Sequence, residues 1–383
     1  MTERLYDKNA YIKSFTTKVI SCEEQKERFA VILEKTAFFP EGGGQPSDTG
    51  MIGQIKVLDV QEKDGVIIHY TDKAIDAGAE VTGQIDWNQR YSNMQNHSGE
   101  HIISGIIHDK FGFNNVGFHL GSEDITVDID GELTKEDLRM VERIANNAVY
   151  ENIDIIAEYP SADILKTLEY RSKLDLTENV RIVTIGKYDK CACCAPHVAK
   201  TGEIGIIKIL DSERYKGGVR IHMLCGSDAL DDYNCKYDNI AEISVILSAK
   251  QNETANAVKR IINELNEEKR SKNEIKKELL ELKIKLIEPS DKNMCIFEEK
   301  CDMNDLRAIV NEVVNKCSGI CAAFSGNDQN GYQYVMTSNS INLKERAKEI
   351  NAALKGKGGG AAMIQGSVKA SKTEIEKYIN DFK

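Results

Sequence analysis

The sequence His97-Ser98-Gly99-Glu100-His101 places two histidines four residues apart in a segment with helical periodicity. From Asn88 to about Lys110, apolar and small residues recur at spacings of three and four, which predicts a helix. Residues four apart on a helix point the same way, so His97 and His101 can bind one metal ion together. Most isolated pairs of this kind are structural or accidental, and a metal site would need further ligands.

A second motif, Cys193-Cys194-Ala195-Pro196-His197, again places two metal-ligating side chains four residues apart. A loop that contains a proline can fold a thiolate and an imidazole back onto one ion. The two motifs together supply nitrogen and sulfur ligands for one tetrahedral Zn²⁺, namely His97, His101, Cys193 and His197. Cys191 and Cys194 flank Cys193, and either thiol could replace it as a ligand.

The first motif also matches His-x-x-Glu-His, the pattern of inverzincin metalloproteases, in which the glutamate is the general base. Five residues are a weak signal on their own. That family also gives no reason for the pair Cys193 and His197, so we disfavour a protease.

The segment Thr36-Ala37-Phe38-Phe39-Pro40-Glu41-Gly42-Gly43-Gly44-Gln45-Pro46 carries three consecutive glycines. Glycines let a backbone approach a ligand and donate its N–H groups. The segment is not a P-loop, because no Gly-Lys-Ser/Thr follows. A tight turn between two strands is the alternative interpretation.

These motifs, with the flanking segments 180–186 and 198–205, resemble the editing domain of alanyl-tRNA synthetase and the freestanding alanyl-tRNA editing proteins. The resemblance implies that Thr36 and Gln45 lie near the aminoacyl ester. It also implies that Gly42, Gly43 and Gly44 shape the pocket, and that the metal ligands are His97, His101, Cys193 and His197. The family usually carries Cys-Gly-Gly-Thr-His where this chain has Cys-Cys-Ala-Pro-His.

The resemblance implies a zinc-dependent hydrolase that deacylates mischarged Ser-tRNA(Ala), or Gly-tRNA(Ala), in trans. A synthetase pocket rejects serine or glycine poorly by size, so a second hydrolytic site corrects the error. A zinc ion could polarise the ester, lower the pKa of a water or template the terminal adenosine. The sequence does not choose among these three roles.

Two other functions stay open at this point. One is a non-catalytic, zinc-organised tRNA-binding protein, and the other is an editor of another aminoacyl-tRNA such as Ser-tRNA(Thr). The editors of threonyl-tRNA share the His and Cys ligands. The glycine-rich loop and a C-terminal glycine motif favour alanine over threonine.

That C-terminal motif, Gly356-Lys357-Gly358-Gly359-Gly360, resembles the glycine motif of a domain shared by alanyl-tRNA synthetase and DHH-type phosphoesterases. Lys357 beside exposed backbone amides would suit a phosphate. The alternative is a packing loop. No DHH catalytic motif is present, which argues against a phosphoesterase.

Composition limits the partners and the compartment. The net charge of −11 argues against a generally nucleic-acid-binding surface, but a local patch can exist, and Arg214, Lys216 and Arg220 are its candidates. No run of about 18 apolar residues and no secretory signal is apparent, so we expect a cytoplasmic protein with reduced thiols.

The 383 residues predict several domains and an α+β fold. We expect a small β-barrel with the glycine-rich loop over 1–88, because strands predicted at 10–20, 28–33, 51–60, 65–70 and 81–87 need closure. A zinc-binding α+β editing domain is expected over 89–238. Within it, Thr134 is expected to begin a helix as half of a capping box.

A long helical linker is expected over 239–290 and a C-terminal α/β domain, DHHA1-like by resemblance, over 291–383. No proline or glycine interrupts residues 243–288, where apolar residues follow a 3-4 spacing. This pattern predicts one continuous coiled-coil-like helix that Pro289 ends. Because coiled-coil seams are rarely left exposed, the helix needs a partner, either a second copy or another helix of the same chain. We favour a homodimer through this helix or the C-terminal domain.

Overall fold

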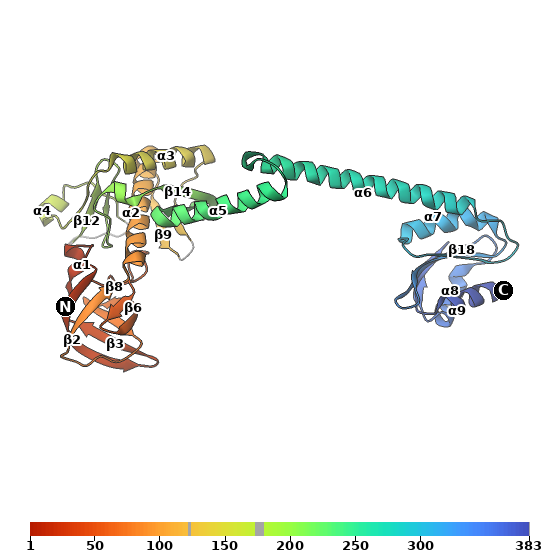
Figure 1. Ribbon diagram of the computed structural model, residues 1–383, viewed down its shortest axis with the longest axis horizontal. Helices are drawn as coiled ribbons and strands as arrows, with labels where there is room; N and C mark the ends of the chain where they lie inside the picture. The colour runs from red at the N-terminus through yellow and green to blue at the C-terminus, as the bar shows by residue number, and fades with distance from the viewer. Residues whose placement is uncertain (122–123, 173–179, 383) are drawn as a thin grey trace. The chain divides into compact units, whose positions relative to one another are not determined.

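The computed structural model describes residues 1–121, 124–172 and 180–382, and the chain divides into two compact units, Met1–Ile243 and Ser244–Lys383 (Figure 1). Both units combine helices with sheets. The mixed α+β class predicted from the sequence is therefore confirmed.

Six strands of the first unit close into a barrel. In barrel order they are β2 (Ser14–Gln25), β3 (Arg28–Leu33), β7 (Val66–Thr71), β6 (Ile55–Lys63), β5 (Gly50–Ile52) and β8 (Glu80–Ile85). Alternate residues face the interior, as in the first half of β2, where Phe15, Thr17 and Val19 are buried. Beside the barrel, β1 (Glu3–Arg4) pairs in parallel with β4 (Lys35–Thr36), and α1 (Leu5–Lys8) follows β1.

The single strand expected over residues 51–60 is wrong. The segment forms two strands, β5 and β6, which pair antiparallel around a turn at Gly53. Gly53 has a φ of 60°, a conformation that glycine adopts without steric cost. The apolar alternation continues through this turn, which is why the sequence pattern did not separate the strands.

Helix α2 (Trp87–Phe111) leaves the barrel and runs through the centre of the first unit (Figure 1). The Asp86 side chain caps its first turn by accepting a hydrogen bond from the Gln89 N–H, and Gly112 ends it with a left-handed φ of 74°. Every residue from Asn93 to Ile107 is buried. A helix buried on all sides is a core element, and polar residues on it must have partners.

Two sheets and a helix pack around α2. One sheet has the order β14 (Ile207–Tyr215), β15 (Gly218–Cys225), β10 (Ile125–Ile129) and β9 (Asn115–Leu120). The other has β11 (Ile155–Glu158), β12 (Ile182–Ile185) and β13 (Asp189–Ala192), and α4 (Ala162–Leu165) follows β11. Helix α3 (Lys135–Glu151) begins with the capping box of Thr134 and Asp137 that the sequence predicts.

The continuous helix predicted over residues 243–288 is also wrong. Helix α5 (Gly226–Ile246) ends, a short 3₁₀ turn (Gln251–Glu253) follows, and α6 (Thr254–Lys285) begins. Ser248 takes a left-handed φ of 48°, and Ser244 Oγ donates to the Ala249 carbonyl at 2.5 Å. A serine side chain that bonds the local backbone competes with the helix, and no proline or glycine is required.

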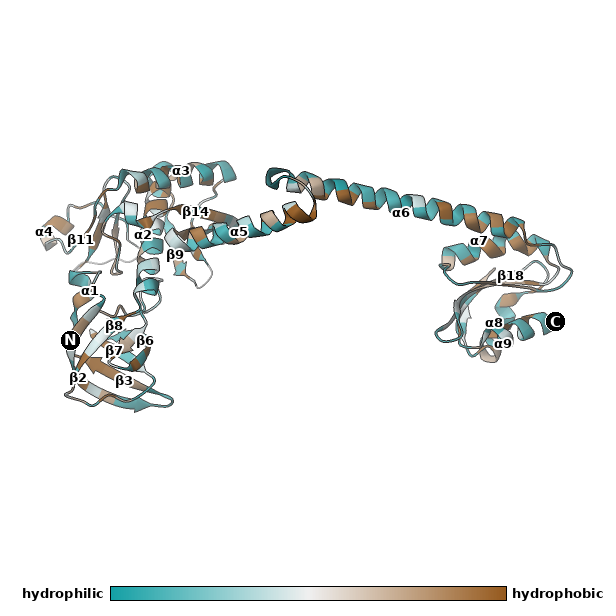
Figure 2. Cartoon of the chain, viewed as in Figure 1, coloured by the Kyte–Doolittle hydropathy of each residue, from teal (hydrophilic) through white to brown (hydrophobic). Residues whose placement is uncertain are grey.

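Apolar side chains recur along α6 (Figure 2). Ile284 packs against residues of α7 (Met303–Val313). Leu280 packs against the same core, and Ala257 is buried. Several other apolar residues stay largely exposed, with exposed fractions from 41% at Val258 and Ile261 to 62% at Ile275, and values between these at Leu265, Leu279 and Leu282.

The second unit is built on a five-stranded sheet of order β16 (Met294–Glu298), β17 (Ile320–Asn327), β18 (Gly331–Ser338), β20 (Ile364–Val368) and β19 (Lys357–Gly359). One core joins α6 and α7 to the sheet, and another joins α8 (Leu343–Ala353) and α9 (Lys372–Asp381) to it. The C-terminal glycines form the edge strand β19. No helix among the described residues has the length and apolar character needed to cross a membrane.

A buried ion pair ties the glycine-rich loop to α2. Arg90 is 0% exposed and its Nε donates to Asp48 Oδ1 at 2.8 Å. Its Nη1 donates to the Ala10 carbonyl at 3.0 Å, and its Nη2 donates to the Ala37 carbonyl at 2.6 Å. Arg90 therefore connects three segments that are far apart in the sequence.

Replacing Asp48 with alanine should lower the free energy of unfolding of the first unit by about 3–5 kcal/mol, because it leaves a buried guanidinium without its carboxylate. Urea unfolding followed by the fluorescence of Trp87, the only tryptophan, measures this. Arg214→Ala is the control, since its side chain is 89% exposed and should change stability by less than about 0.5 kcal/mol. A loss below about 1 kcal/mol for Asp48→Ala would contradict the prediction.

Candidate metal centre

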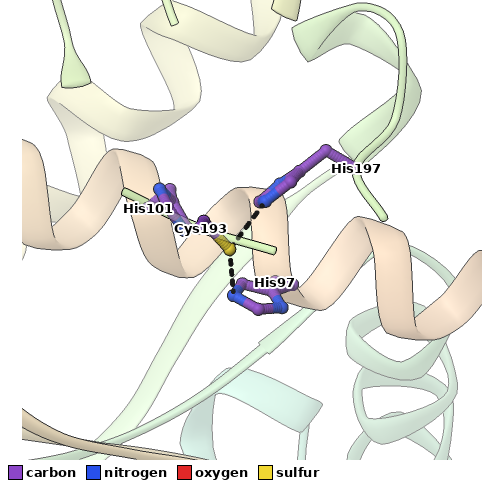
Figure 3. A group of neighbouring side chains, drawn as sticks. All are labelled: His97, His101, Cys193 and His197. Carbon is purple, nitrogen blue, oxygen red and sulfur yellow. Dashed lines mark hydrogen bonds between the residues drawn. The ribbon is translucent and has the colours of Figure 1, made fainter. Parts of the chain in front are cut away.

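The four predicted ligands converge at one place in the first unit (Figure 3). His97 and His101 come from one face of α2, and Cys193 and His197 come from the loop after β13. Their ligand atoms all lie within 4.8 Å of one another. The Cys193 Sγ lies 3.6 Å from His97 Nε2 and 3.4 Å from His197 Nε2.

A neighbouring side chain holds the Nδ1 atom of each of the three imidazoles. His97 Nδ1 lies 2.8 Å from Gln45 Oε1, and His101 Nδ1 lies 2.8 Å from Asp189 Oδ2. His197 Nδ1 lies 3.0 Å from Ser98 Oγ. Because Gln45 Oε1 and the Asp189 carboxylate only accept, His97 and His101 carry their protons on Nδ1, which leaves Nε2 as the basic atom.

This arrangement fits a zinc ion. Zn–N and Zn–S bonds of ordinary length place tetrahedral ligand atoms about 3.3–3.6 Å apart. The measured sulfur–nitrogen distances of 3.4 and 3.6 Å match that spacing. Three neutral imidazoles and one thiolate form the donor set that zinc prefers, and their second nitrogens have the partners that zinc-binding histidines usually have.

The protonation states of the cluster follow from burial and proximity. Burial opposes ionisation of Cys193, but the nearby His97 and His197 and hydrogen bonds from His101 and His197 outweigh it and hold the thiol pKa well below its usual range. Burial lowers the pKa of His197 to about 3, although the Cys193 charge opposes this. Burial opposes a charge on His101, but the hydrogen bonds to Asp189 and Cys193, together with the charges of Cys193 and Cys191, outweigh it and raise the His101 pKa.

The other thiols of the loop behave differently. Burial raises the pKa of Cys191 to about 11 and that of Cys194 to about 11. Both stay protonated at neutral pH, and a protonated thiol is a poor metal ligand. Cys191 does lie near His101 and Asp189 in a second group of metal-ligating atoms, but Asp189 already bonds His101 and Arg171.

The glycine-rich loop borders the same centre. Gly43 lines the cavity beside the histidines and has a φ of 63°. A Cβ on Gly44 would lie 2.3 Å from the Phe118 carbonyl oxygen, so only glycine allows the loop to dock on β9. Gln45 is fully buried, and its Nε2 has no hydrogen-bond partner among the described residues. That amide nitrogen is an unsatisfied donor on the side chain that contacts His97.

Thr36 lies inside the barrel and does not line the cavity. Its Oγ1 lies 2.8 Å from His69 Nε2 and accepts from the Phe38 N–H at 3.1 Å. His69 Nδ1 lies 3.1 Å from the Val31 carbonyl, which fixes Nε2 as the acceptor of the Thr36 proton. His69 carries no signal in the sequence, because its contacts form only when the barrel closes.

A cavity of about 1080 Å³ opens beside the cluster and is lined by described residues from α2, β9, the loop around Arg171 and the β12–β13 hairpin. Arg4, Tyr159 and Arg181 also line it. The sequence predicted no role for these residues, for Asp189 or for Ser98, because their contacts depend on the folded chain and not on a spacing along the sequence.

The predicted basic residues lie elsewhere. Arg220 and Lys216 stack on the Tyr215 ring at 3.8 and 4.9 Å on the β14–β15 hairpin. Arg220 also binds Asp128 through its Nε at 2.7 Å, whereas Arg214 lies 3.9 Å from Glu132. Lys357 belongs to β19 in the second unit. None of the four lines the cavity described above.

Family models match three parts of the chain. Residues 5–89 match "tRNA synthetases class II (A)", and residues 180–222 match "Threonyl and Alanyl tRNA synthetase second additional domain". Residues 291–383 match the DHHA1 domain. The second match contains Cys193 and His197 of the cluster.

Similar proteins extend these matches over the whole chain. The alanyl-tRNA editing protein AlaX-L of Pyrococcus horikoshii is 30% identical over 98% of this chain and 96% of its own length. The alanyl-tRNA editing protein Aarsd1 of Bos taurus is 30% identical over 67% of this chain and 62% of its own length. The alanine–tRNA ligase of Pyrococcus abyssi is 29% identical, and the alignment covers 42% of that ligase.

The fold and the cluster thus define a protein with a synthetase-type editing domain followed by a DHHA1 domain. The 30% identity to AlaX-L extends over nearly the full length of both chains and narrows this class to one family. The chain belongs to the family of alanyl-tRNA editing proteins, which confirms the family predicted from the sequence.

Stability of the first unit should depend on pH through His69. Burial lowers the pKa of His69 to about 4, against an ordinary value of 6.5, and the Val31 carbonyl only partly opposes this. Between pH 6.5 and 4 the unfolded chain binds the proton more readily, so stability falls as pH falls, by up to about 1.4 kcal/mol per pH unit.

Urea unfolding of the metal-free protein across this pH range, followed by Trp87 fluorescence, measures the slope. His69→Gln should make it less steep, because glutamine can still accept the Thr36 proton but does not titrate, whereas His197 titrates in both proteins. His108→Gln is the control, since His108 is exposed and should leave the slope unchanged. Equal slopes for the wild type and His69→Gln would contradict the role of burial.

Proposed function

We propose that the chain is a zinc-dependent aminoacyl-tRNA hydrolase that deacylates mischarged Ser-tRNA(Ala), and Gly-tRNA(Ala), in trans. The observation that carries the proposal is the convergence of His97, His101, Cys193 and His197 beside a cavity. Membership of the alanyl-tRNA editing family supports tRNA(Ala) as the partner. A tRNA substrate would place the protein in the cytoplasm.

In this proposal the four cluster residues hold one Zn²⁺. When bound, the ion would supply Lewis-acid polarisation of the ester or a fixed template for the terminal adenosine. The chain's own residues do the rest. Gln45, Asp189 and Ser98 orient the three imidazoles, and the wall formed by Gly42, Gly43 and Gly44 allows the ester to approach closely.

Two polar side chains would read the aminoacyl group. The free Nε2 of Gln45 can donate to an ester oxygen. Thr36 donates its proton to His69 and uses one lone pair for the Phe38 N–H, so its second lone pair could accept a proton from a serine hydroxyl. Because Thr36 is fully buried and does not line the cavity, the serine side chain would have to extend beyond the cavity to make this contact. Alanine lacks this hydroxyl, which would favour serine as the substrate.

The remaining predictions concern the body of the tRNA and the assembly. Arg214 and Lys216 would contact phosphates of the tRNA. Arg220 would contribute less to this contact, because it already binds Asp128. Lys357 would contact a phosphate from the second unit. The exposed apolar residues of α6 support a homodimer through residues 243–288 or the C-terminal domain. The barrel would then comprise residues 1–88, the editing domain 89–238, the linker 239–290 and the tRNA-binding domain 291–383.

The purified protein should contain one zinc per chain and hydrolyse Ser-tRNA(Ala) over many turnovers while sparing Ala-tRNA(Ala). A Cys193→Ala, His197→Ala variant should lose both the metal and the activity, because half of the ligand set is gone. Metal analysis and loss of radiolabelled amino acid from tRNA measure the two effects. Cys194→Ala is the matched control and should retain both.

Zinc binding without turnover on Ser-, Gly- or Ala-tRNA(Ala) would favour the non-catalytic tRNA-binding alternative. Faster turnover on Ser-tRNA(Thr) than on Ser-tRNA(Ala) would favour an editor of threonyl-tRNA. Either result would overturn the proposed function.

Thr36→Val keeps the shape of the side chain and removes its hydroxyl. We expect kcat/KM for Ser-tRNA(Ala) to fall about tenfold, the value of one hydrogen bond, while Gly-tRNA(Ala) changes little. Single-turnover deacylation of the two substrates measures the ratio. An equal loss on both substrates would assign Thr36 to the packing of the barrel only.

A further inference from the structure

Glu100 is a buried carboxylate on the face of α2 that carries the metal ligands. His97, Glu100, His101 and Ser104 follow one another at helical spacings of three, one and three residues, so their side chains share one face. Glu100 is 3% exposed, and it lines the cavity together with His97 and His101.

Its two oxygens have different surroundings. Oε1 accepts hydrogen bonds from Ser104 Oγ and from Asn115 Nδ2, the second at 2.6 Å. Among the described residues, Oε2 accepts no hydrogen bond, and no lysine, arginine or histidine forms an ion pair with Glu100. Two neutral donors therefore fix the carboxylate through Oε1 and leave Oε2 without a hydrogen bond, in a residue that lines the cavity.

A buried carboxylate without a cation in direct contact is unusual, because burial of an unpaired charge costs several kcal/mol. Arg171 also lines the cavity and acts on Glu100 through its charge, but its Nε binds Asp189 and it forms no ion pair with Glu100. The other acidic residues that line the cavity are either paired or exposed. Asp189 uses both oxygens, one on His101 and one on Arg171. Asp109 and Glu169 are exposed. Glu100 is thus the buried acid of the cavity that is placed for a cationic ligand.

We propose that Glu100 Oε2 receives the α-ammonium group of the aminoacyl ester. This inference rests on the proposed function and names the substrate class more closely, as aminoacyl esters with a free amino group. The ammonium carries a positive charge and three donors, and it would complete the hydrogen bonding of Glu100. An N-acylated amino acid has no charge and one donor, so N-blocked and peptidyl esters would be poor substrates.

The test compares Ser-tRNA(Ala) with N-acetyl-Ser-tRNA(Ala), using the full-length, zinc-loaded protein and Glu100→Gln. Glutamine keeps an oxygen for Ser104 and Asn115, removes the charge and replaces the accepting Oε2 by an amide nitrogen that only donates. We expect the wild type to prefer the free amine by about 10- to 100-fold, the range for a hydrogen bond to a charged group. Glu100→Gln should lose this preference through a slower reaction with Ser-tRNA(Ala), while N-acetyl-Ser-tRNA(Ala) reacts at an unchanged rate.

Asp109→Asn is the matched control, because it removes an exposed charge from the same helix and the same cavity. It should retain the wild-type preference. Zinc content and thermal stability are measured for all variants, and both should stay at wild-type values in Glu100→Gln.

The outcomes separate the two proposals. If the wild type hydrolyses neither ester, the proposed function itself fails. If it hydrolyses both equally, or if Glu100→Gln keeps the preference, the role of Glu100 in recognising the ammonium is overturned and editing still stands. Loss of zinc from Glu100→Gln with equal loss on both esters would likewise overturn it and assign Glu100 to the metal site.

Discussion

The candidate centre depends on the buried ion pair between Arg90 and Asp48. Asp48 ends the glycine-rich loop, and Arg90 lies two helical turns before His97 on α2. The pair therefore fixes the distance between loop and helix. Gln45, three residues before Asp48, can meet His97 Nδ1 at 2.8 Å only when this distance is set. A barrel loop with three glycines would otherwise have too much freedom to orient a ligand.

Three parts of the fold then orient the imidazoles separately. Gln45 belongs to the barrel loop, Ser98 to α2 and Asp189 to β13. No isolated segment contains the complete set, so the Nε2 atoms converge only after barrel, helix and hairpin have assembled. Such a site couples metal affinity to the folding of the whole first unit, because binding energy is available only to the assembled form. The assembly of this site from three parts of the fold also explains why α2 carries polar residues although it is buried on all sides.

The sequence predicted the ligands and not their partners, and the reason is physical. Spacings of four residues are local and follow from helix geometry, so His97 and His101 could be paired before the fold was known. The capping box at Thr134 is equally local. Asp189 and His69 act through contacts formed across 88 and 33 residues, which leave no pattern along the chain. Helix α5 ends at Ile246, and the turn that follows is closed by two backbone hydrogen bonds and the Ser244 side chain, none of which the heptad spacing predicts.

The loop that carries Cys193 shows how this chain departs from the Cys-Gly-Gly-Thr-His pattern. Arg181 Nη1 donates to the carbonyls of Cys193 and Ala195 at 3.0 and 2.8 Å. The Ala195 side chain is fully buried and packs in one cluster with Tyr6 and Phe39. The Arg181 guanidinium and the Ala195 methyl group therefore hold this loop in place. In the Cys-Gly-Gly-Thr-His pattern, the backbone amides of the glycines would do so. Because Arg181 directly precedes β12, the β11–β12–β13 sheet sets the position of the thiolate relative to α2.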